Sequence, residues 1–136
     1  GRETPVSAGD LFRLEVPVPG TVRIESLGLR MRFRVLRRPP HRPSATARRA
    51  YLDLERIAGT LVVRSPRPGD RIQPLGMQGS RKLSRLFIDE KVPRADRGRI
   101  PVLADEHSVL WVPGIRLSER ARVAEGTRHV LKAEII

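Results

Sequence analysis

The sequence predicts an α+β fold: an N-terminal antiparallel β-meander followed by a small α+β module with a mixed or antiparallel sheet and one main helix. Apolar and polar residues alternate with the period of a strand through most of the first sixty residues, whereas residues 80–89 have the spacing of an amphipathic helix. The 136 residues, 39% hydrophobic and 31% charged, suit one globular domain or two very small ones. We divide the chain into a β-rich subdomain, 1–59, and an α+β domain, 60–136.

The meander is predicted from three alternating segments, at residues 12–16, 22–25 and 29–35. A single apolar face requires Ile24 opposite Met31 in the second hairpin and Val16 opposite Ile24 in the first. The other face then carries four arginines, Arg23, Arg30, Arg32 and Arg34. The pattern fits an RNA-binding surface, but it fits the solvated face of an edge sheet somewhat better.

Residues 37–49 break the alternation with three prolines, no acidic residue and almost nothing apolar, so we expect a linker or an exposed loop. From Arg30 to Arg49 there are eight arginines and no Asp or Glu. The segment is basic enough to follow a phosphate backbone, but its composition is also that of a disordered chain. Residues 50–58 then predict a short strand that leads into a helical turn.

The second part of the chain is predicted to form a sheet from five further strands, at residues 61–63, 101–104, 108–112, 115–117 and 128–136. The second and third of these form a hairpin across Asp105 and Glu106. The uninterrupted apolar run Val109–Val112 indicates a strand that is covered on both faces.

Structural turns are predicted at Pro68, Gly69, Asp70, Gly76, Gly79, Pro113 and Gly114. Pro68-Gly69 is the pair that a type II turn needs, because Pro presets its own φ and Gly accepts the positive φ that follows. Asp70 comes just after the turn, where it is an ion-pair partner for an arginine or a cap for local N–H groups. The loop between the two later glycines either bends sharply or admits close approach by another molecule.

The main helix is predicted over residues 80–89, with Ser80 as its N-cap. Its apolar stripe consists of Leu83, Leu86 and Phe87. Arg81 and Lys82 then lie in the first turn, where the positive end of the helix dipole disfavours cations. They either receive a phosphate or carboxylate at the free N–H groups of the helix or are solvated surface residues.

The net charge of +12, from 27 cations and 15 acids, indicates a polyanionic partner. The few aromatic residues fall in apolar patterns, which leaves no exposed pair of rings on which unpaired bases could stack. A folded RNA helix, recognised through its phosphates, 2′-hydroxyls and shape, fits this composition better than a single strand.

Residues for catalysis, metal binding or membrane insertion are not evident in the sequence. The three histidines lack metal-ligand spacing, the carboxylates of residues 70–96 lie among cations as salt-bridge partners, and there is no Walker loop. The chain has no cysteine and no apolar run long enough to span a membrane. We therefore expect a cytoplasmic protein with no metal, no membrane contact and no catalytic residues of its own.

An ordered series of motifs carries a resemblance to a known family: Arg64, Pro68-Gly69-Asp70-Arg71, Pro74-Leu75-Gly76-Met77, Gly79, Lys82-Leu83, Phe87-Ile88-Asp89, Lys91-Val92-Pro93-Arg94, Arg97, Pro101 and Trp111-Val112-Pro113-Gly114-Ile115-Arg116-Leu117. Over roughly residues 51–136 the chain resembles the C-terminal region of bacterial tRNA(Ile)-lysidine synthetase. The SGGxDS motif of that family's catalytic PP-loop domain does not occur in it.

The resemblance implies a tRNA-holding fragment whose partner is tRNA(Ile) with a CAU anticodon, gripped on its acceptor side. Conversion of the wobble cytidine to lysidine, with ATP, Mg and lysine, is then expected of the missing N-terminal domain and not of this fragment. A homodimer is left open. The tRNA-binding residues are expected among the cations of the matching region, namely Arg64, Arg71, Arg81, Lys82, Arg85, Lys91, Arg94, Arg97 and Arg116.

Two other functions compete with this interpretation. Residues 76–79, GMQG, have the form of the GxxG loop of a KH domain, although that domain places the loop between two helices and Pro74-Leu75 precede it here. A non-enzymatic module that docks a partner protein through the basic, proline-rich segment 37–49 is the second alternative.

Overall fold

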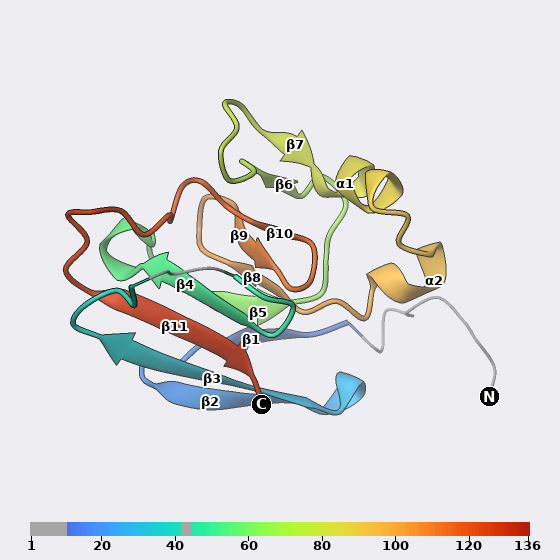
Figure 1. Ribbon diagram of the computed structural model, residues 1–136. Coiled ribbons are helices and arrows are strands. Elements are labelled where there is room, and N and C mark those ends of the chain that lie inside the picture. The colour runs from blue at the N-terminus through green and yellow to red at the C-terminus, as the bar shows by residue number, and fades with distance from the viewer. Residues whose placement is uncertain (1–10, 42–44) are drawn as a thin grey trace.

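Two antiparallel sheets and a small projecting unit make up the fold (Figure 1). A computed structural model describes residues 11–41 and 45–136. The five-stranded sheet has the order β1 (Arg13–Glu15), β5 (Val62–Arg64), β8 (Val102–Ala104), β9 (Val109–Val112) and β10 (Arg116–Leu117). The four-stranded sheet has the order β2 (Gly20–Ile24), β3 (Leu29–Leu36), β11 (Val130–Ile135) and β4 (Arg49–Asp53).

The projecting unit combines a two-stranded ribbon with two short helices, β6 (Arg71–Ile72), β7 (Arg81–Lys82), α1 (Leu83–Asp89) and α2 (Arg94–Arg97). Single 3₁₀ turns at Glu25–Leu27 and Leu54–Arg56 follow β2 and β4. The predicted α+β class is confirmed, with mostly antiparallel sheet and one main helix.

Two hydrophobic cores lie on opposite faces of the five-stranded sheet. The larger one fills the space between the sheets, where Phe33 of β3 and Leu131 of β11 meet Trp111 of β9. The smaller one contains the α1 stripe together with Ile72 and residues of β8 and β9. All four residues of Val109–Val112 are buried, so the prediction of a strand covered on both faces is confirmed.

The predicted meander is wrong at its first strand, because β1 pairs with β5 in the five-stranded sheet instead of with β2. Leu14 therefore lies opposite Val63, and Val16 donates its N–H to the carbonyl of Leu61. Pro17 and Pro19, in the connection to β2, have no N–H to contribute to a hairpin ladder. Alternation of apolar residues shows which face is buried, but it does not show which strand is the partner.

The hairpin of β2 and β3 forms as predicted, but its register differs by two residues. Ile24 lies opposite Leu29, and Met31 lies opposite Val22 instead of Ile24. Gly28 has a positive φ of 64° and donates its N–H to the carbonyl of Glu25, so the turn ends at Gly28 and pairing begins at the next residue. A shift of two residues preserves the buried face, which explains why the apolar pattern is satisfied by both registers.

The last strand of the chain, β11, connects the parts that the sequence separates. It lies between β3 and β4 with six and five residues in register, respectively. The expected boundary at residue 60 therefore does not separate the sheets, since β1 joins the five-stranded sheet and β11 the four-stranded one. On β11 itself, Leu131 and Ala133 are buried and Lys132 and Glu134 are half-buried, in agreement with the predicted alternation.

Candidate nucleic-acid interface

Most of the predicted tRNA-binding cations belong to the projecting unit, residues 71–97, which we call the basic unit. Figure 1 shows β6, β7, α1 and α2 outside the two sheets. Six predicted cations of the basic unit are exposed: Arg71, Arg81, Lys82, Arg85, Lys91 and Arg94. The apolar stripe of α1 is buried and anchors the unit on the five-stranded sheet, as predicted.

The N-terminus of the helix differs from the prediction. Helix α1 begins at Leu83, and its N-cap is Lys82, whose side chain makes no capping hydrogen bond. Arg81 and Lys82 are extended and form β7, while the Ser80 hydroxyl accepts a hydrogen bond from Nε of Arg71 at 2.9 Å. Arg81 and Lys82 therefore precede the first turn of the helix instead of lying in it, although Lys82 still adjoins the positive end of its dipole.

The ribbon places like charges opposite each other. Arg71 lies directly opposite Lys82 and Ile72 opposite Arg81, and the N–H of Leu83 donates to the carbonyl of Asp70 at 2.9 Å. Ile72 is fully buried, so this register is fixed by the core. Like charges directly opposite in a ladder destabilise it.

The predicted cations divide into paired and unpaired groups. Arg85 pairs with Asp89 at 3.5 Å and Arg116 with Glu90 at 3.4 Å. The Nε–H of Arg97 donates to the carbonyl of Val92, and the guanidinium carbon lies 5.8 Å from the centre of the Phe87 ring. Arg97 therefore stabilises the turn between the two helices. Within the described residues, Arg71, Arg81, Lys82, Lys91 and Arg94 have no acidic partner in an ion pair.

Arg64 is placed differently from the other predicted cations. Its side chain is buried, and its two terminal nitrogens bond both oxygens of Asp70, at 2.8 and 2.9 Å. Asp70 also accepts the N–H of Arg67 at 2.7 Å, so it is both an ion-pair partner and a local cap. We assign Arg64 to the structure of the Pro68-Gly69 turn, because it is not exposed for a surface contact.

The predicted turns are present. Gly69 has a φ of 86°, and the N–H of Asp70 donates to the carbonyl of Arg67 at 3.1 Å, as in a type II turn. Positive φ also occurs at Gly76, Gly79 and Gly114. A Cβ at Gly76 or Gly79 would have nothing within 4 Å, so these glycines serve the bend. Their loop joins β6 to β7, a setting that differs from the two helices of a KH domain.

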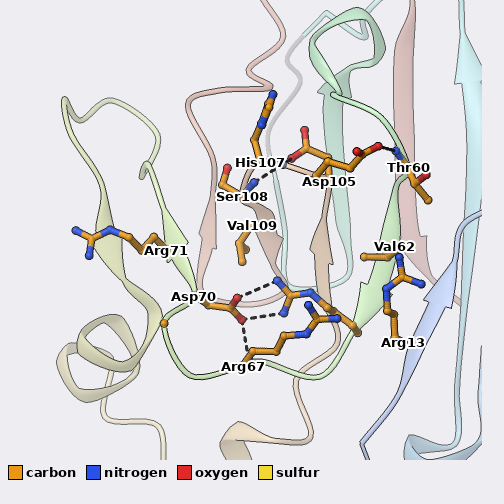
Figure 2. A pocket seen from close by; sticks show the side chains of 13 residues that line it. Arg13, Thr60, Val62, Arg67, Asp70, Arg71, Asp105, His107, Ser108 and Val109 are labelled. Carbon is orange, nitrogen blue, oxygen red and sulfur yellow. Dashed lines mark hydrogen bonds and ion pairs between the residues drawn. The ribbon is translucent and has the colours of Figure 1, made fainter.

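A pocket of about 380 Å³ lies beside the Pro68-Gly69 turn (Figure 2). Its walls come from β1, β5, the turn itself, the start of β6 and the turn between β8 and β9. It contains two arginines that we did not predict as site residues, Arg13 and Arg67. Arg67 stands next to a predicted turn, whereas the position of Arg13 follows from the unpredicted pairing of β1 with β5.

One wall of the pocket is held by a network around Asp105, which the sequence did not reveal. Its carboxylate accepts hydrogen bonds from the N–H groups of Ala58, His107 and Ser108 and from both terminal nitrogens of Arg120. Burial alone would raise the pKa of Asp105, but the Arg120 hydrogen bond and these N–H groups outweigh it and hold the pKa at about 2. Asp105 is therefore a charged structural group.

The arginines of the first hairpin form a second basic surface. Arg23 and Arg30 lie opposite each other on β2 and β3. Arg32 and Arg34 share Glu134 of β11, at 2.9 and 3.9 Å. Burial would raise the pKa of Glu134, but the hydrogen bond from Arg32 and the surrounding cations lower it. Two of these four cations are thus partly neutralised.

Metal sites and membrane spans are both absent from the part of the chain that the structure describes. Among residues 11–41 and 45–136, no group of three or more His, Cys, Asp or Glu side chains is placed to hold a metal ion. Over the same residues, no helix combines the length and the hydropathy that crossing a membrane requires.

Comparison with protein families gives a match over residues 61–133 to the family described as TilS substrate C-terminal domain. A tRNA(Ile)-lysidine synthase from Symbiobacterium thermophilum is 39% identical over 125 residues, which cover 88% of this chain and 25% of that protein. Another, from Caldanaerobacter subterraneus subsp. tengcongensis, is 45% identical over 84 residues, or 62% of this chain and 18% of that protein. The chain thus spans about a quarter or less of the length of these relatives.

A crystal structure of a TilS C-terminal domain is similar to this fold with a TM-score of 0.79 and 28% identity, over 92% of this chain and 95% of that one. An N-terminal fragment of the phenylalanyl-tRNA synthetase β-subunit from Pyrococcus horikoshii shares the fold alone, with a TM-score of 0.54 and 21% identity over 64% of this chain and 27% of that one.

Proposed function

This chain belongs to the family of TilS substrate C-terminal domains, and we propose that it binds the acceptor side of tRNA(Ile) through phosphate and shape contacts. The domain missing from this chain would convert the wobble cytidine of the CAU anticodon to lysidine with ATP, Mg and lysine. We propose that the chain itself holds no nucleotide and no metal, and that it acts in the cytoplasm, where its tRNA partner is found.

The opposition of Arg71 and Lys82 carries this proposal. Both side chains are exposed, they face each other across the β6–β7 ladder, and neither has an acidic partner among the described residues. A ladder of only two residue pairs gains little from placing cations opposite each other. A phosphate backbone lying across the ribbon would remove this repulsion, because one phosphate can accept from both side chains.

The composition of the basic unit favours contacts to phosphates over contacts to bases. Its one aromatic side chain, Phe87, is buried in the smaller core and is covered by Arg97. Arginine and lysine bind phosphates without reading sequence, and A-form RNA is recognised mainly by its shape and backbone. Selection among tRNAs would therefore depend on the shape of the acceptor stem.

The test is a salt titration of tRNA(Ile) binding by the wild type and by Arg71→Gln/Lys82→Gln. The variant should bind more weakly, and the slope of log K against log salt should flatten by about 0.7–0.9 for each phosphate that the variant no longer neutralises. Arg23→Gln/Arg30→Gln is the matched control, because it also removes two cations that lie directly opposite each other. Its affinity and slope should stay close to those of the wild type.

Three results would contradict the proposal. An equal decrease in affinity in the two variants would mean that only net charge matters. A decrease in the control alone would place the RNA on the four-stranded sheet. Absence of tRNA binding by the wild type at low salt would exclude the function altogether.

Incubation of the chain with tRNA, ATP and lysine should give no lysidine, and product formation would show catalytic residues that we have not recognised.

A further inference from the structure

Arg13, Arg64 and Arg67 line the pocket beside the Pro68-Gly69 turn, and the Asp70 carboxylate forms an ion pair with one of them, Arg64. Arg13 and Arg64 lie directly opposite each other on β1 and β5. Arg64 bonds Asp70 through both terminal nitrogens, and Asp70 also accepts the N–H of Arg67. Since the carboxylate balances one guanidinium, this end of the pocket retains two positive charges.

Of the other two acids that line the pocket, Asp105 forms an ion pair with Arg120, whereas Glu106 has no cationic partner among the described residues and is held by a backbone N–H. Asp105 is bonded by Arg120 and by three backbone N–H groups, and Glu106 accepts the N–H of Thr60 at 2.6 Å. Within the described part of the chain, neither Arg13 nor Arg67 has an acidic partner in an ion pair. The pocket therefore has unpaired donors for an anion at one end.

The orientation of the side chains separates this pocket from the ribbon. Figure 2 shows the side chains of Arg13 and Arg67 in the lower part of the pocket, with Arg13 on the far side of Arg67 from Asp70, whereas the side chain of Arg71 extends away from both. Val62 and Val109 lie between this lower part and the turn that carries Asp105. Arg71 lines the pocket at the start of β6 but donates its Nε to Ser80 of the ribbon loop.

We propose that this pocket binds the 5′-terminal phosphate of the tRNA, a proposal that rests on the proposed function. A phosphate monoester carries about −1.5 to −2 charges at neutral pH, which matches the two unbalanced guanidinium charges. An internal phosphodiester carries a single charge, and its chain must both enter and leave the site. A terminal group needs only to enter, and a concave pocket with donors at one end suits it.

The location of the pocket agrees with this occupant. It adjoins β6, the strand that carries Arg71 of the proposed phosphate-binding ribbon. An acceptor stem whose backbone crosses the ribbon would have its end nearby, because the 5′ terminus is the end of that stem. The buried pair of Arg64 and Asp70 fixes the turn between the two sites.

The experiment compares two forms of tRNA(Ile), one with a 5′-monophosphate and one treated with phosphatase to leave a 5′-hydroxyl. The wild-type chain should bind the 5′-hydroxyl form about tenfold more weakly, the ratio expected for the loss of charge-assisted hydrogen bonds. Arg13→Gln/Arg67→Gln should bind both forms equally, with an affinity near that of the wild type for the 5′-hydroxyl RNA. The matched control Arg23→Gln/Arg30→Gln should keep the tenfold difference.

The outcomes separate this proposal from the proposed function. The proposed binding of the 5′-phosphate in the pocket would be contradicted if the wild type bound the two RNAs equally, or if Arg13→Gln/Arg67→Gln kept the preference. Either result would leave the proposed tRNA binding intact. Failure of the wild type to bind either RNA at low salt would overturn the proposed function and the pocket with it. Arg13 and Arg67 are exposed, so the thermal midpoint of the variant should match that of the wild type. If it does not, Arg67→Gln alone gives the same comparison.

Discussion

Arg64 and Asp70 form a bidentate ion pair across the Pro68-Gly69 turn, with N–O distances of 2.8 and 2.9 Å and only 9% of each side chain exposed. The pair joins β5 to the start of β6, so it sets the position of the basic unit relative to the five-stranded sheet. A residue predicted to bind RNA thus has a structural role.

Removing one partner of this pair should be costly. Asp70→Ala leaves a buried guanidinium without its counter-charge, and we expect the free energy of unfolding to fall by about 3–5 kcal/mol. Chemical denaturation measures this value. The double variant Arg64→Leu/Asp70→Ala should be destabilised by less than the sum of the two single variants, since neither charge remains. Additive effects would show that the two groups do not interact.

Burial of the α1 stripe predicts a strong contrast between neighbouring residues. Phe87 is in the smaller core, so Phe87→Ala should lower the free energy of unfolding by about 3–5 kcal/mol. Ile88, with 55% of its surface exposed, is the control, and Ile88→Ala should change it by less than about 0.5 kcal/mol. Similar decreases in both variants, measured by denaturation, would mean that α1 is oriented differently.

Asp105 makes the stability dependent on acidic pH. Its pKa is about 2 in the folded chain against an ordinary value of 3.8, so it contributes stability that is complete above pH 3.8 and is lost as the pH falls towards 2. The difference corresponds to about 2 kcal/mol. Asp105→Asn should be less stable at neutral pH and should show a flatter stability curve in this window. An unchanged curve in denaturation experiments would contradict the assignment.

Limited proteolysis should cut first between Arg37 and Arg49. Arg37, Arg38 and Arg48 are exposed arginines, and none of the described residues 37–41 and 45–49 belongs to either core. Trypsin fragments identified by mass spectrometry would locate the first cut. A first cut within residues 70–100 would show that the basic unit is less well anchored than its buried stripe indicates.

Local patterns were sufficient to predict most of the elements. The turns at Pro68-Gly69 and Pro113-Gly114, the stripe of α1 and the doubly covered β9 each depend on residues close together in sequence. Phe87, Leu86 and Leu83 are buried because their spacing puts them on one side of a helix, whatever that helix packs against.

The rest depends on pairings between distant residues, which alternation does not specify. The choice of β5 as the partner of β1 brings Arg13 opposite Arg64, and no local signal could indicate the pocket that results. Likewise, the ion pair between Arg120 and Asp105 depends on the tertiary structure, which local sequence patterns do not specify. The predicted helix began too early because serine is a common N-cap residue. Burial of Ile72 instead fixes a ribbon in which Arg81 and Lys82 are extended.

The central place of β11 has a consequence for the order in which the chain can fold. Strand β3 pairs with β2 on one side and with β11 on the other. The residues of β11, 130–135, come about a hundred positions later in the sequence than those of β3. The ribosome must therefore synthesise residues 130–135 before the four-stranded sheet can be completed. Such distant pairing carries a large loop-closure entropy and is typical of domains that fold in milliseconds to seconds.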